Sequence, residues 1–137
     1  MKQIADFFAL YKCFAWEKDT PNMINLYDEN VVVFDMWQDG YCVGLTQWKR
    51  VIAQWLGSLK DERVNVDFEM INIQNDAAIG FASAVIRYQA MATDGTVIRS
   101  MKNRITIGFA KTENDWKVIH QHTSAPIDSN LQAILDI

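Results

Sequence analysis

The second half of the chain constrains the fold most, because it consists of long segments with strand character separated by short turns. The first segment, "VNVDFEMINIQ", alternates so that Val64, Val66 and Phe68 fall on one side. The next, "AAIGFASAVIRYQAMA", leads to Asp94 and Gly95, a dipeptide typical of a tight hairpin. Two further segments, "TVIRSMKNRITIGFAKT" and "WKVIHQHTSA", are joined by the turn "ENDW". We therefore expect a meander of long antiparallel strands.

The first part of the chain is mainly helical in pattern. Apolar side chains recur at three- and four-residue spacings in the first segment, at Ile4, Phe7, Phe8, Tyr11, Phe14 and Ala15. A second helix follows, with Thr20 as its N-cap and Pro21 at the first helical position. After a strand that begins near Val31 and a turn near Gly40, "GLTQWKRVIAQWLGSLKDE" predicts a third helix. The tail, residues 128–137, is compatible with a short C-terminal helix.

Because helices come first and strands follow, we predict an α+β domain. In it a strongly bent antiparallel sheet folds around the long N-terminal helix, accompanied by two further helices, and leaves a cavity at one end. The chain has 137 residues, which is enough for one domain with a sizeable core. We expect residues 1–137 to form that single domain.

Composition excludes several classes of function. The net charge is −4 and no run of lysine or arginine occurs, so we expect no nucleic-acid partner. No apolar run is long enough to span a bilayer, and Asp6 and Lys12 interrupt the segment in which a signal peptide would be apolar. Cys13 and Cys42 form neither a disulfide framework nor a zinc motif. We expect a cytoplasmic protein with reduced thiols and no membrane contact.

Two stretches resemble a known superfamily. "LYDENVVVFD" follows two helices, and "NRITIGFAKTENDWKVIHQHTSAP" carries Arg104, then Trp116 and Lys117, then a His-x-His-x-Ser-x-Pro pattern at residues 120–126. They resemble the nuclear transport factor 2-like superfamily, which includes SnoaL-like polyketide cyclases, ketosteroid isomerases and the association domain of calcium/calmodulin-dependent kinase II. The resemblance covers nearly the whole chain. It implies a cone-shaped, cystatin-like α+β barrel with a pocket at its open end, and a homodimer formed through the sheet.

Two further positions resemble the ketosteroid isomerases. Tyr11 stands where that family has an oxyanion-hole tyrosine on the first helix, and Asp35 stands where it has a general-base aspartate. The resemblance therefore implies catalytic roles for both residues. The isomerases also use a second, protonated aspartic acid beside the tyrosine. Segment 97–109 of this chain contains no acid and carries Lys102 and Arg104 instead.

Asp35 is also unusual on local grounds, because it interrupts an apolar strand. Val31, Val33, Asp35 and Trp37 share one face if the strand is regular. A buried carboxyl with few partners has a raised pKa, which suits a general base. The alternative is that Asp35 ends the strand, caps a turn and faces solvent.

The two histidines lie two positions apart on the last predicted strand. Regular alternation places them on the face of Trp116 and Val118, and both look into the cavity if that face is concave. One interpretation is a buried hydrogen bond for His120 and a place at the pocket mouth for His122. Another is proton transfer by His122, since an imidazole titrates near neutral pH. A metal site needs a third ligand, and we expect no metal.

Alternation and resemblance disagree on Arg104. Ile105 and Ile107 alternate with Arg104, which points the arginine outward, whereas the resemblance implies a buried arginine at the pocket floor. We follow the resemblance. Arg104 would then bind a carboxylate, from a ligand or from Asp35, through its guanidinium fork. The apolar face of that strand would meet a second subunit.

These residues support two hypotheses. In the first, the protein is a small-molecule-binding enzyme that needs no cofactor, in which Asp35 or His122 removes a proton next to a carbonyl. Tyr11 and Arg104 would stabilise the resulting enolate. In the second, it is a non-catalytic, dimeric ligand-binding or assembly module in which Arg104, His120 and His122 hold the ligand.

Both hypotheses share the pocket and the class of ligand. Trp37, Trp55 and Tyr88 are candidates for its aromatic walls, with ordinary core packing as the alternative. The expected ligand is a small apolar or carboxylate-bearing molecule.

Overall fold

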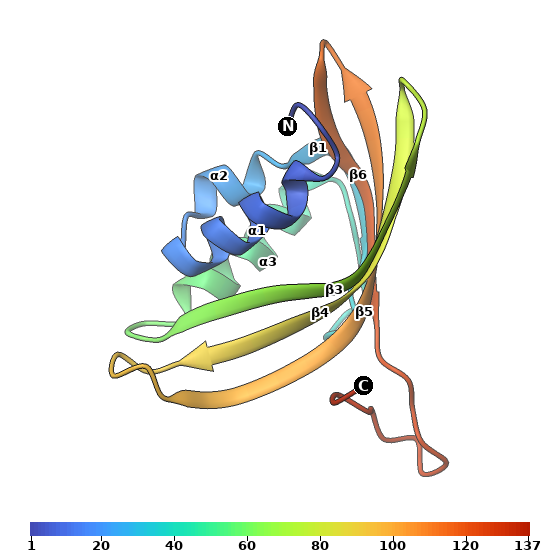
Figure 1. Cartoon of the computed structure of the whole chain (residues 1–137). Helices are drawn as coiled ribbons and strands as arrows, with labels where there is room; N and C mark the ends of the chain where they lie inside the picture. The colour runs from blue at the N-terminus through green and yellow to red at the C-terminus, as the bar shows by residue number, and fades with distance from the viewer.

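Three helices lie on one side of a single curved sheet (Figure 1). The structure is a computed structural model that describes residues 1–137. The helices are α1 (Asp6–Glu17), α2 (Thr20–Ile24) and α3 (Leu45–Gly57). The strands are β1 (Tyr27–Phe34), β2 (Tyr41–Val43), β3 (Arg63–Asn75), β4 (Ile79–Met91), β5 (Val97–Thr112) and β6 (Asp115–Ser124). The predicted α+β class, with a bent sheet wrapped around the first helix, is confirmed.

The six strands follow the spatial order β2-β1-β6-β5-β4-β3. All neighbouring pairs are antiparallel except β1 and β6, which run parallel, so the sheet departs from a purely antiparallel one at this pair. The predicted hairpin turn joins β4 to β5. There Gly95 has φ +88°, in the left-handed region that favours glycine, and Asp94 Oδ1 accepts a hydrogen bond from Thr96 N at 2.9 Å.

The second helix is capped one residue earlier than the sequence pattern predicts. Asp19, not Thr20, is the N-cap, and its Oδ1 accepts a hydrogen bond from Asn22 N at 3.2 Å. A carboxylate at this end also interacts favourably with the helix dipole. The third helix begins at Leu45, directly after Gly44.

The core lies between the helices and the concave face of the sheet. Phe7 of α1 is wholly buried and packs edge-to-face on Phe109 of β5, with 5.6 Å between ring centroids. Ile105 and Ile107 of β5 lie beside it, at 1% and 0% exposure. Burying one such side chain contributes about 1.5–3 kcal/mol, so β5 is anchored by its apolar face.

Arg104 therefore points outward, as alternation alone predicts. It is exposed on the convex face, while Ile105 and Ile107 face the core. The inward orientation expected from the resemblance is wrong for this chain, because turning Arg104 inward would expose the side chains that pack on α1. The expectation that this apolar face meets a second subunit is wrong for the same reason. The inward position next to it belongs to Asn103, which is 1% exposed.

Both histidines also lie on the convex face, contrary to expectation. Phe109 pairs with Val118, but Gly108 pairs with His120, so Ile119 is an extra residue in β6. A bulge of this kind reverses which side chains face inward beyond it. Before it, Trp116 and Val118 face the core; after it, the inward residues are Gln121 and Thr123. The rings of His120 and His122 pack against exposed Phe34, with centroids 5.0 and 5.5 Å away.

The tail does not form a helix. Residues 125–137 fold into a short hairpin that lies below the sheet in Figure 1. Asp128 Oδ1 accepts hydrogen bonds from Asn130 N at 2.8 Å and Gln132 N at 3.0 Å. Such side-chain acceptors favour turns over helices.

None of the three helices is long and apolar enough to cross a membrane.

Candidate functional site

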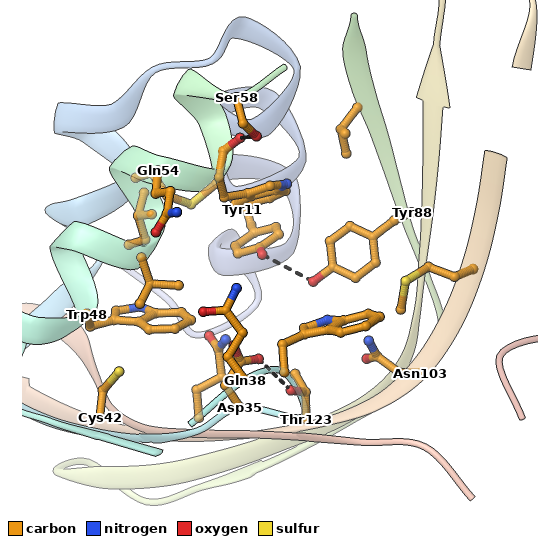
Figure 2. Close-up of a pocket in the computed structure, with 18 of the residues that line it drawn as sticks. Tyr11, Asp35, Gln38, Cys42, Trp48, Gln54, Ser58, Tyr88, Asn103 and Thr123 are labelled. Carbon is orange, nitrogen blue, oxygen red and sulfur yellow. Dashed lines mark hydrogen bonds between the residues drawn. The ribbon is translucent and has the colours of Figure 1, made fainter. Parts of the chain in front are cut away.

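A cavity of about 700 Å³ lies between the helices and the concave face of the sheet (Figure 2). Five of the residues singled out from the sequence line it: Tyr11, Asp35, Trp37, Trp55 and Tyr88. They come from α1, the segment after β1, α3 and β4. Arg104, His120 and His122 are not among its lining residues. The cavity thus combines the Asp35 carboxyl group with tyrosine hydroxyls and indole rings.

Asp35 is held at the end of β1 by its own backbone and by β6. Its N–H donates to Gly40 O at 2.8 Å, which closes the turn that follows the strand. Its Oδ1 accepts a hydrogen bond from Thr123 Oγ1 at 3.1 Å, shown as a dashed line in Figure 2. The Thr123 hydroxyl oxygen in turn accepts from Met36 N at 3.1 Å. Asp35 therefore sits in a defined position at the cavity wall.

The surroundings of Asp35 favour its neutral form. Burial raises the pKa of this carboxyl, and hydrogen bonds from Thr123 and the Met36 backbone oppose the rise only in part. Asp35 forms no ion pair, since the carboxylates that do so are Glu62, Asp67, Glu69 and Asp115. A carboxyl without a cationic partner in a largely apolar site holds its proton more tightly than an exposed carboxyl, which suits a general base.

Two tyrosine hydroxyls lie across the cavity from Asp35. Tyr11 Oη and Tyr88 Oη lie 3.3 Å apart, within hydrogen-bond distance (Figure 2). Burial raises the pKa of Tyr88 to about 12, and it raises the pKa of Tyr11 well above its usual value. The negative charge of Asp35 adds to both shifts, which places the carboxyl in the same electrostatic environment. Both phenols are therefore protonated hydrogen-bond donors at neutral pH.

Aromatic packing holds this pair in place. Trp55 of α3 stacks on Tyr11, with ring centroids 6.3 Å apart, and meets Tyr88 edge-on at 6.0 Å. Tyr11 is only 4% exposed. Trp37 is different, because it is 50% exposed and lies at the edge of the cavity. Rigid aromatic walls with one open side suit a flat apolar ligand.

Three inward polar residues escaped the sequence analysis. Asn103 is 1% exposed, and its Oδ1 has no hydrogen-bond partner. Alternation along β5 predicts this position, because Asn103 is two residues before Ile105 and therefore shares its inward face. Gln121 and Thr123 carry no such signal, since the bulge in β6 places them inward. Gln121 Oε1 accepts a hydrogen bond from the buried Tyr27 hydroxyl at 2.6 Å.

The mouth of the cavity is more polar than its interior. Its lining includes the side chains Gln38, Asp39, Gln54, Ser58, Arg99 and Ser100. Arg99 is already paired with Glu62 at 2.6 Å, so its charge is partly neutralised. No cluster of three His, Cys, Asp or Glu side chains in the protein is arranged to hold a metal ion. The polar groups inside the cavity include the Asp35 carboxyl, the phenols and the Asn103 amide.

Comparison with known proteins agrees with the fold and confirms the resemblance to SnoaL-like proteins. The sequence profile of the SnoaL-like domain family matches residues 4–128. No curated protein matches the sequence. A nuclear transport factor 2-like protein of unknown function from Pseudomonas putida is 21% identical, with a TM-score of 0.85 over 98% of this chain and 92% of that one.

Two other solved structures are similar over most of their length. A protein from Xanthomonas campestris that is provisionally described as a calcium/calmodulin-dependent protein kinase II association domain is 14% identical. Its TM-score is 0.75 over 90% of this chain and 85% of that one. A nuclear transport factor 2-like superfamily protein from Salmonella enterica is 16% identical, with a TM-score of 0.73 over 92% and 90%. At these identities the likenesses establish the fold, and the profile match establishes the family. The chain has the fold of the nuclear transport factor 2-like structures and belongs to the SnoaL-like domain family.

Proposed function

We propose that the protein binds a small, neutral, largely apolar molecule and removes a proton next to its carbonyl group. The observation that carries this proposal is the cavity itself. A carboxyl with a raised pKa and no cationic partner shares it with two hydrogen-bonded, protonated phenols. Proton abstraction next to a carbonyl needs this combination of a base and a donor for the developing oxyanion.

In this proposal Asp35 is the general base. Its pKa is raised, so Asp35 is a stronger base than an exposed carboxylate and is better suited to remove a proton from carbon. The Tyr11–Tyr88 pair donates to the carbonyl oxygen of the ligand, on which negative charge grows as the proton leaves. The Asn103 amide supplies a further polar contact. A buried amide oxygen without a partner costs about 1–3 kcal/mol, so a ligand group that satisfies it contributes to binding.

The charges around the cavity favour a neutral ligand over a carboxylate. Asp35 is acidic, Arg104 lies outside, and Arg99 at the mouth is paired with Glu62. An anionic ligand would lose its hydration and meet a carboxylate of like charge. The carboxylate-bearing ligand expected with an inward Arg104 therefore has no support here.

Exchange of the α-protons of 2-tetralone in D₂O, followed by proton NMR, tests the proposal. The wild type should accelerate exchange, and Asp35→Asn should slow the catalysed rate by about 10²–10⁴-fold, the range for losing a general base. His122→Asn is the matched control and should leave the rate unchanged, because His122 lies on the convex face. Equal rates for wild type and Asp35→Asn would remove Asp35 from the chemistry.

A second candidate is a non-catalytic, dimeric binding or assembly module. It is favoured by the exposed aromatic group on the convex face, where Phe34 is 44% exposed beside both histidines. Contact between two sheets through such a group would form a homodimer. Sedimentation velocity should show a dimer that Phe34→Arg dissociates. Ligand binding without proton exchange would favour this module over the enzyme.

A further inference from the structure

The C-terminal hairpin, residues 125–137, is largely self-contained. Asp128 N donates to Gln132 O at 2.9 Å, and Ile134 N donates to Pro126 O at 2.8 Å. The Asp128 carboxylate accepts two further backbone hydrogen bonds within the same turn. These bonds shape the hairpin without help from the rest of the protein.

One hydrogen bond joins this hairpin to the rest of the fold. The β6 strand ends at Ser124, which pairs with Arg104, so the edge of β5 beyond that point has no strand beside it. Lys102 N, two residues further along the same edge, donates to Leu135 O at 2.6 Å. No other hydrogen bond runs between residues 125–137 and the preceding chain. The hairpin thus caps an open sheet edge through a single hydrogen bond.

The hairpin also supplies part of the cavity wall. Leu135 is half-buried and lines the cavity. It is hydrogen-bonded to Lys102, and the residues on either side of Lys102, Met101 and Asn103, also line the cavity. Two other large apolar side chains of the hairpin face water, with Leu131 77% and Ile127 60% exposed, whereas Ile134 is partly buried. Swinging the hairpin away would break one hydrogen bond and expose only the buried sides of Ile134 and Leu135. Its opening free energy is therefore far below that of unfolding the sheet.

We propose that the C-terminal hairpin is a removable wall of the cavity, that it opens at the Lys102–Leu135 bond to admit ligand, and that Leu135 limits the length of ligand that fits. The proposal rests on the cavity being the ligand site, as argued above. It does not require that the ligand undergoes chemistry. Closing the wall excludes water from the apolar cavity and strengthens the polar contacts within it.

Amide hydrogen exchange tests the opening without any ligand. In the full-length protein, Lys102 N–H should exchange at least about 100-fold faster than the N–H of Thr106, which lies on the same strand in the middle of the β5–β6 ladder. Asp128→Ala removes the acceptor of two hydrogen bonds in the hairpin and should speed Lys102 exchange by about 10-fold more. Asp128→Asn keeps an acceptor and is the control. Equal protection of Lys102 and Thr106 would show a fixed wall and overturn the proposal.

Binding of a series of 4-alkylcyclohexanones, measured by calorimetry, tests the role of Leu135. Leu135→Ala should shift the tightest-binding member to a side chain about two or three carbons longer, because it removes three carbon atoms from the wall. Leu131→Ala, at the exposed tip, should leave the optimum unchanged. The same optimum in wild type and Leu135→Ala would show that Leu135 does not limit length.

The two measurements separate this proposal from the proposed function. Binding with the expected shift, but no α-proton exchange of 2-tetralone, would support the wall and contradict the enzyme. If no alkylcyclohexanone binds to any variant, the proposed ligand class is wrong, and the exchange of Lys102 alone decides whether the wall opens.

Discussion

The two faces of the sheet come from the same strands but have opposite chemistry. On the concave face, β4, β5 and β6 present Tyr88, Asn103 and Thr123 to an apolar cavity. On the convex face, β5 and β6 present Arg104 and His122 to water. The titratable groups on the concave face have raised pKa values because burial penalises their charged forms.

This difference shows that residue type alone is a poor guide to a site. The histidines and Arg104 have the more reactive or more strongly charged side chains, yet their place on the convex face separates them from the cavity. A carboxyl, two phenols and an amide are ordinary in water and become unusual only where the sheet and helices exclude it. Three sets of variants test how far this contrast extends.

The largest expected effect comes from adjacent residues of β5. Ile107 is fully buried and Thr106 is exposed. Ile107→Asp should lower the free energy of unfolding by more than about 4 kcal/mol, because it buries an unpaired charge in the core. Thr106→Asp should change it by no more than about 0.5 kcal/mol in the monomer. Urea unfolding of both variants measures the difference, and similar losses would contradict the assignment of faces.

A smaller effect is expected from two adjacent residues of β6 that follow the bulge and point to opposite faces of the sheet. Gln121→Leu removes the acceptor of the buried Tyr27 hydroxyl and should cost about 1–3 kcal/mol of unfolding free energy. His120→Gln, one position earlier on the convex face, should cost less than about 0.5 kcal/mol. Thermal and urea unfolding of the pair provide the measurement. A larger loss for His120→Gln would mean that His120, not Gln121, faces the core.

The smallest effect concerns the charge of Asp35. Its pKa is raised in the folded protein, so the folded state holds the proton more tightly than the unfolded chain. Stability should therefore fall as pH rises from the unfolded value, about 3.9, through the higher folded value. Asp35→Asn should be more stable than wild type at pH 7, by less than about 1 kcal/mol because solvent screens this half-buried group.

Urea unfolding of Asp35→Asn and wild type across this pH range gives the result. The gap in stability should shrink as pH falls through the folded value and vanish below the unfolded value, where both side chains are neutral in both states. Asp39→Asn, in the turn after β1, is the control. A wild type that is more stable than Asp35→Asn at pH 7 would mean that the carboxylate, not the acid, is the favoured form.

Local patterns predicted the fold class and much of the cavity. The spacing of apolar residues identified α1 and placed Tyr11 on its buried face, and the interruption of an apolar strand singled out Asp35. These signals depend on residues close in sequence, which is why they survive without knowledge of the fold. The same alternation also predicted the outward position of Arg104, and only the resemblance pointed the other way.

The remaining differences depend on contacts that local patterns do not contain. The extra residue at Ile119 appears only when β6 is laid against β5, so regular alternation placed the histidines on the wrong face. The tail is compatible with a helix by its local pattern, but Asp128 accepts backbone hydrogen bonds that stabilise a turn. Asn103 carries no local signal of a functional role, because a neutral amide between Lys102 and Arg104 resembles an ordinary surface residue.

The parallel pairing of β1 with β6 fixes when the site can assemble during synthesis. Asp35 and Thr123 are 88 residues apart, so at about 5–20 residues per second the ribosome needs several seconds to add the second after the first. Until β6 emerges, β1 has no strand on that side and its edge is open to wrong partners. The α1 helix is complete long before it has a finished sheet to cover. The pocket is therefore among the last parts of a newly made chain to take shape, and its completion marks the end of folding.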